Sequence, residues 1–111
     1  MSVCFGKNKG VIGKWTTPSI MYKPSKVEMD DVAEIYVKVS QRGTQIAQYG
    51  IEHAQRTEDG FIWLMSQEDT AKLTITMTAT VQVDYKTTGG LRYTTMPKTL
   101  EVVNSAVEEE I

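Results

Sequence analysis

At 111 residues, the chain has the length of one domain and is long enough to bury a core of its own. Hydrophobic residues make up 41% and charged residues 23% of the sequence, a composition that excludes an intrinsically disordered chain. The formal net charge of −2 gives no long-range attraction for nucleic acid or for an anionic membrane, so we expect neither as a partner.

Residues that carry catalytic or metal chemistry are few. Cys4 is the single cysteine, so it forms no intrachain disulfide, and His53 is the single histidine, so no cage of histidines and cysteines is available for a metal. The glycines lack phosphate-loop spacing, and no nucleophile elbow or EF-hand loop is present. We therefore predict no enzymatic activity, no cofactor and no metal site, with weak calcium binding by an acidic loop as the alternative. Cys4 is interpreted as an inert thiol and His53 as an exposed or interface side chain.

Residues 1–15 have the composition of an N-terminal arm, because three glycines interrupt the segment and its lysines keep it soluble. Apolar and polar residues then alternate over 19–23, between Pro18 and Pro24. Proline cannot donate to a β-ladder, so this segment is predicted to be a first or an edge strand.

Two neighbouring segments predict a β-hairpin in the first half of the chain. Ile35, Val37 and Val39 share one face of an alternating run, which indicates a half-buried strand. Gly43 then separates this run from a predicted return strand over residues 44–52.

A short helical turn is predicted after a continuously apolar strand. Residues 61–65 predict a strand that is covered on both faces, or one that has a face in the core and a face against a partner. Ser66 is a favourable N-cap, and Asp69 follows it in a capping-box-like arrangement. The β-branched residues 74–76 do not favour continuing the helix. We therefore predict a helical crossover near residues 66–73 that carries the chain from one sheet to the other.

The most regular alternation lies in the second half of the chain. Four inward residues, spaced by two, are followed by a Gly89-Gly90 turn and a return strand that Pro97 interrupts. The four residues are Ala79, Val81, Val83 and Tyr85. In the closing segment, Leu100 and Val102 share one face of the predicted strand.

Together these elements predict an all-β fold. The expected architecture is an antiparallel, immunoglobulin-like β-sandwich of six or seven strands with one helical crossover. A small, partly open barrel is the alternative. The expected boundaries are an arm over 1–15, the sandwich over 16–104 and an acidic tail over 105–111.

Exposed aromatic residues are the candidates for a binding surface, because aromatic side chains anchor protein interfaces. Trp63 lies in the apolar strand and is predicted to be core. Trp15 lies at the end of the arm beside Lys14, where its ring either pins the arm to its own sandwich or is buried in a neighbour. Tyr36 and Tyr93 face away from the apolar sides of their strands in some registers. The interface candidates are therefore Lys14, Trp15, Tyr36 and Tyr93.

The order of these features over residues 16–103 resembles a group of small phage and prophage proteins of Gram-positive and gut bacteria. The resemblance is carried by Thr16-Thr17-Pro18, by the turn Leu64-Met65-Ser66-Gln67-Glu68-Asp69-Thr70, and by a long hairpin with glycine at its tip. Trp15 stands where these proteins usually have glycine, and Met65 is inserted into the turn pattern. In style, the sequence is similar to the immunoglobulin-like N-terminal domain of lactococcal-phage upper baseplate proteins.

The resemblance implies a virion component, namely a tail, baseplate or head-decoration subunit. Such a subunit assembles with copies of itself or with other phage structural proteins, after synthesis in the cytoplasm of the bacterial host. It implies no catalytic residues. No segment approaches the ~20 apolar residues of a membrane span, and no signal-peptide h-region is seen, so we expect no export signal in the chain itself. The alternative function is a carbohydrate- or receptor-binding module, which would gather Trp15, Tyr36 and Tyr93 into an exposed cluster for a glycan.

Overall fold

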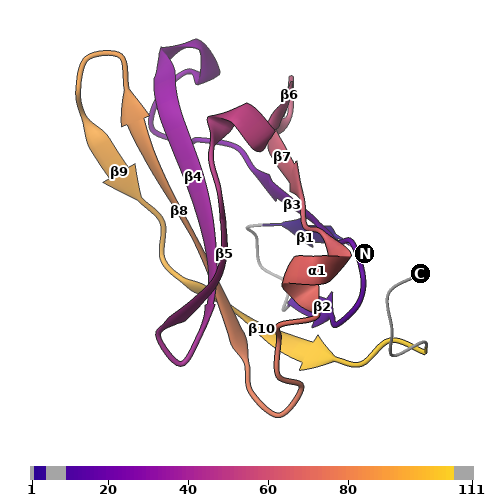
Figure 1. Ribbon diagram of the computed structural model, residues 1–111. Helices are drawn as coiled ribbons and strands as arrows, with labels where there is room; N and C mark the ends of the chain where they lie inside the picture. The colour runs from indigo at the N-terminus through magenta and orange to yellow at the C-terminus, as the bar shows by residue number, and fades with distance from the viewer. Residues whose placement is uncertain (1, 5–9, 107–111) are drawn as a thin grey trace.

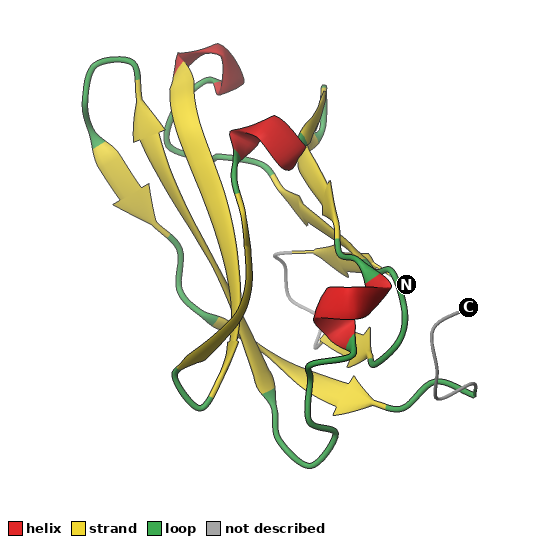
Figure 2. Cartoon of the chain, viewed as in Figure 1, coloured by secondary structure: helices red, strands yellow, loops and turns green. Residues whose placement is uncertain are grey.

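The chain folds into two β-sheets that pack face to face, with a short helix at one side (Figures 1 and 2). The computed structural model describes residues 2–4 and 10–106, with side chains from residue 11 onwards. The small sheet has the strand order β1 (Ser2–Cys4), β3 (Ser19–Tyr22), β7 (Gly60–Leu64), β6 (Gln55–Thr57). The large sheet has the order β2 (Gly10–Gly13), β10 (Lys98–Val103), β8 (Ala79–Thr87), β4 (Val32–Gln41), β5 (Thr44–Tyr49), and β9 (Arg92–Thr94) pairs with β8. The helical elements are η1 (Met29–Asp31), η2 (Ile51–His53) and α1 (Gln67–Thr70).

This strand order is that of an immunoglobulin-like sandwich, so the predicted fold class is confirmed. In the large sheet, β10, β8, β4 and β5 follow the G-F-C-C′ order, and in the small sheet β3, β7 and β6 follow the B-E-D order. The pairs among these strands are antiparallel. Two further pairs, β1 with β3 and β2 with β10, are parallel, and both use residues from the segment expected to be an arm.

The described strands of the expected arm, β1 and β2, are therefore part of the sandwich. Strand β2 lies at the edge of the large sheet, and the Ile12 side chain is completely buried in the core. Because β1 pairs with β3, the strand after Pro18 is an inner strand and not the predicted edge. Pro18 and Pro24 both lie outside β3, so neither removes a ladder hydrogen bond.

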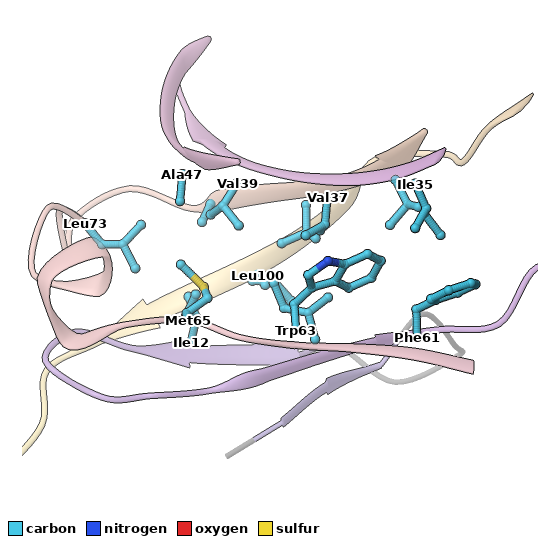
Figure 3. Packing of buried hydrophobic residues seen from close by; sticks show 14 of the residues in the cluster. Ile12, Ile35, Val37, Val39, Ala47, Phe61, Trp63, Met65, Leu73 and Leu100 are labelled. Carbon is cyan, nitrogen blue, oxygen red and sulfur yellow. The ribbon is translucent and has the colours of Figure 1, made fainter. Parts of the chain in front are cut away.

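The core lies between the sheets and follows the alternation of the sequence (Figure 3). Ile35, Val37 and Val39 project inward from β4, and the four inward residues predicted on β8 are all buried. Trp63 is completely buried, as predicted, and its indole Nε1 donates a hydrogen bond to the Gly50 carbonyl at 2.9 Å. The strand over residues 60–64 alternates, with Leu64 exposed to solvent, so only one of its faces is in the core.

The predicted hairpin between β4 and β5 closes through Arg42 and Gly43. Both residues have positive φ, 49° and 77°, which is the backbone of the two-residue turn that suits the twist of paired strands. Gly43 allows this conformation at no steric cost.

Helix α1 is the predicted crossover from the small sheet to the large sheet. The Ser66 hydroxyl accepts a hydrogen bond from the Asp69 backbone N–H at 3.1 Å, as expected for an N-cap. The buried Thr70 hydroxyl donates to the Thr16 carbonyl at 2.8 Å, and Leu73 is buried directly after the helix. The contacts of Thr70 and Leu73 hold the second half of the crossover against the sandwich.

The buried position of Ile12 gives a test of whether β2 belongs to the cooperative fold. Ile12→Ala should lower the free energy of unfolding by about 3 kcal/mol, because it removes a completely buried side chain and leaves a cavity. Leu64→Ala, at an exposed apolar position, is the matched control and should change it little. The measurement is urea unfolding followed by tryptophan fluorescence. If Ile12→Ala lowers the free energy of unfolding no more than the control does, β2 is not part of the cooperative unit.

Candidate functional site

Tyr36 lies on the outer face of the large sheet, away from the core. It is 39% exposed and stands opposite Asp84 on β8, which in turn stands opposite Thr94 on β9. A surface hollow of about 290 Å³ adjoins Tyr36 and Asp84. Six residues line it: Tyr36, Lys38, Gln48, Gln82, Asp84 and Arg92. This set provides one aromatic ring together with hydrogen-bond donors and acceptors.

Tyr93, in contrast, lies on the inner face of the sheet. It stands opposite Tyr85, and the two rings stack with centroids 5.2 Å apart and an interplanar angle of 22°. Because Tyr85 is buried in the core, Tyr93 covers the end of the core and is only partly exposed. Tyr36 and Tyr93 therefore point to opposite faces of the same sheet.

Trp15 lies in the turn between β2 and β3. The Thr16 backbone N–H donates to the Gly13 carbonyl at 3.3 Å, and Trp15 adopts a φ of 68° within this turn. A positive φ is unusual for a bulky residue and carries steric strain. The half-buried indole has the Lys14 ammonium 6.0 Å from its ring centroid, and the Lys14 backbone N–H donates to the Val103 carbonyl at 2.8 Å.

The four predicted interface residues thus occupy three separate places. Lys14 and Trp15 are adjacent, but the exposed aromatic cluster of Trp15, Tyr36 and Tyr93 does not form. His53 is exposed at the end of η2, with its ring edge-on to Tyr49. Cys4 lies in β1, and its side chain is outside the described part of the chain, as is most of the acidic tail.

No metal-binding group of three or more His, Cys, Asp or Glu side chains occurs among the described residues. A second and larger hollow, of about 880 Å³, lies between residues 23–31 and the β6–β7 hairpin. Its lining carries charges of both signs, and an ion pair joins Arg56 to Asp30 across it. None of the helices in the described ranges is long and apolar enough to cross a membrane.

A contact that was not predicted from the sequence joins β5 to helix α1. The Tyr49 hydroxyl donates a hydrogen bond to the Asp69 carboxylate, and the Lys72 ammonium lies 3.4 Å from the same carboxylate. Burial and then this bond raise the pKa of Tyr49 well above its ordinary value. For Asp69, burial alone would raise the pKa, but the hydrogen bonds from Tyr49 and Lys72 outweigh it and the pKa is lowered.

No family model and no curated protein matches the sequence. Among solved structures, the chain is similar to the immunoglobulin-like domain of mouse leukocyte-associated immunoglobulin-like receptor 1, crystallised as a strand-swapped dimer. The identity is 11% and the TM-score is 0.49, and the match covers 89% of this chain and 92% of the receptor domain. The assignment of the fold rests on the strand order described above.

The carboxylate of Asp69 predicts a defined response of stability to acid. Asp69→Asn should lower the free energy of unfolding at neutral pH by about 1 kcal/mol, because the charged acceptor of two hydrogen bonds is lost. The folded-state pKa of Asp69 lies below its ordinary value, so its contribution is present above the ordinary pKa and is lost as the pH falls through the folded-state value. The difference between wild type and variant should therefore close in acid.

Urea unfolding at a series of pH values from neutral to acid measures this difference. Glu68→Gln is the control, because it removes a neighbouring carboxylate of the same helix. The Glu68 carboxylate makes no hydrogen bond to any of the described residues. A difference for Asp69→Asn that stays constant into acid would contradict the assignment of the stabilising charge to Asp69.

Proposed function

We propose that the protein is a non-enzymatic structural or accessory component of a phage virion, in a tail, a baseplate or a head decoration. It acts through contacts with copies of itself or with other virion proteins, and it joins the particle after synthesis in the host cytoplasm. The sequence resemblance over residues 16–103 supports the class of protein. The conformation of Trp15 supports assembly through a contact surface.

Trp15 is the observation that carries the proposal. A left-handed φ costs a non-glycine residue on the order of 1 kcal/mol, so glycine would suit this turn better. In the proteins that the sequence resembles, the residue before Thr-Thr-Pro is usually glycine, and here it is Trp15. A large aromatic ring held half-exposed at a strained position gains its stabilisation from a contact outside the turn. Burial in a neighbouring subunit supplies such a contact.

The edge of the large sheet offers a second surface for assembly. Strand β5 carries no charged side chain, and its outer edge makes no backbone hydrogen bond to another segment in the described parts of the chain. An edge of this kind accepts a further strand from a partner. The unpaired Ile46, at a bulge opposite β4, limits the length of such a pairing.

Trp15→Gly separates assembly from folding. The substitution relieves the strain at positive φ but loses partial burial of the ring, so the free energy of unfolding should change by less than about 1 kcal/mol. Self-association of the pure protein, or binding to its partner in the particle, should weaken by at least about tenfold. Light scattering over a concentration series measures self-association, and urea unfolding measures stability. Leu64→Ala, an exposed apolar residue of the other sheet, is the control.

If Trp15→Gly instead causes a large loss of stability and leaves association unchanged, the indole anchors the turn to its own sandwich. The virion assignment has its own test, which is immunodetection of the chain in phage particles purified from the bacterium that encodes it. Absence from purified particles would refute that assignment, whatever the behaviour of Trp15→Gly.

A further inference from the structure

The hollow on the outer face of the large sheet is built from three neighbouring rows of side chains. Tyr36 and Asp84 form the middle row, between a row that holds Lys38 and a row that holds Glu34, Lys86 and Arg92. A smaller hollow of about 190 Å³ adjoins the first and shares Tyr36, Asp84 and Arg92 with it. Tyr36 therefore lies between two depressions, with its ring accessible from both.

The charged side chains of this face are not used by the fold. Lys38, Asp84 and Arg92 make no ion pair and no side-chain hydrogen bond to any other described residue. Gln82 differs, because its amide nitrogen donates to the Thr94 hydroxyl and to the Thr95 carbonyl, each at 3.0 Å. The β8–β9 pair is thereby held in place while the charges beside it remain available to a ligand.

The chemistry of the lining matches a sugar. Sugar hydroxyls both donate and accept hydrogen bonds, and the amides, the Asp84 carboxylate and the cations supply both functions. The apolar C–H face of a sugar ring packs on an aromatic ring such as that of Tyr36. Across the two hollows, three cations outnumber two carboxylates: Lys38, Lys86 and Arg92 against Glu34 and Asp84. A guanidinium binds a carboxylate through two hydrogen bonds.

A protein partner would need a different surface. The centre of a protein interface is depleted in charge and contains several aromatic or aliphatic anchors. On this face Tyr36 is the one large apolar residue among the six that line the main hollow, and three of the other five are charged. We propose that the outer face of β4, β5, β8 and β9 binds an oligosaccharide that carries a carboxylate, with Tyr36 as the stacking residue and Arg92 as the carboxylate ligand.

This site is independent of the assembly surface at Trp15. Trp15 follows β2, which is separated from β8 by β10 in the strand order of the large sheet. A failure of either proposal therefore leaves the other unchanged, and the variants of the two sites are different.

An array that displays neutral and carboxylate-bearing oligosaccharides is the first experiment, with the full chain as the probe. Carboxylate-bearing oligosaccharides should bind, and the strongest of them should then be titrated by calorimetry. Tyr36→Ala should weaken its binding by about tenfold or more, and Tyr36→Phe, which keeps the ring, should retain most of the affinity. Arg92→Gln should remove the preference for acidic over neutral sugars, and added salt should weaken binding to the wild type.

Leu64→Ala, on the outer face of the small sheet, is the control and should bind as the wild type does. Thermal unfolding of each variant establishes that it is folded. An array with no signal above blank positions would overturn the proposal, as would a Tyr36→Ala variant that is folded and binds as tightly as the control. If the wild type binds neutral and acidic sugars equally, and Arg92→Gln does the same, then Arg92 is not the carboxylate ligand. The proposal that the ligand carries a carboxylate would then be overturned.

Discussion

The indole of Trp63 holds the two sheets and the loop between them in one arrangement. It projects from β7 of the small sheet into the middle of the core, towards Val37 of the large sheet (Figure 3). Its N–H donates to the carbonyl of Gly50, which directly follows β5, where the chain turns towards the small sheet. A buried indole N–H without an acceptor would be costly, so the position of this loop and the position of the ring depend on each other. One side chain thereby sets the spacing of the sheets and the path of one crossover between them.

The elements whose order is encoded locally were predictable from the sequence. Alternation in β4 and β8 assigns the inward residues correctly because a strand with one buried face must place every second side chain in the core. The N-cap at Ser66 was predictable for a similar reason, since the hydroxyl and the N–H that it accepts from are only three residues apart. Gly43 marked its hairpin because the turn requires a positive φ.

The features that the sequence did not predict depend on partners that are distant in the chain. Ile12 lies among glycines, and its burial follows from the pairing of β2 with β10, at the other end of the sequence. The register of β9 against β8 turned Tyr93 inward onto Tyr85, and a shift of one residue would have turned it outward. The bond of Tyr49 to Asp69 likewise joins a strand to a helix that the tertiary fold alone brings together.

Trp15 is a position that the fold alone does not explain, and the proposed assembly contact rests on it. A glycine would serve the turn at Trp15 with less strain, so the sequence and the local backbone conflict at this position. Natural sequences are consistent across levels at most positions, so a local conflict of this kind supports the proposal that Trp15 makes a contact beyond its own domain. The turn at Trp15 and the face around Tyr36 lie at different strands of the large sheet, with β10 between β2 and β8. A subunit held in an assembly through the turn after β2 would therefore keep the face around Tyr36 open to a second, chemically different ligand.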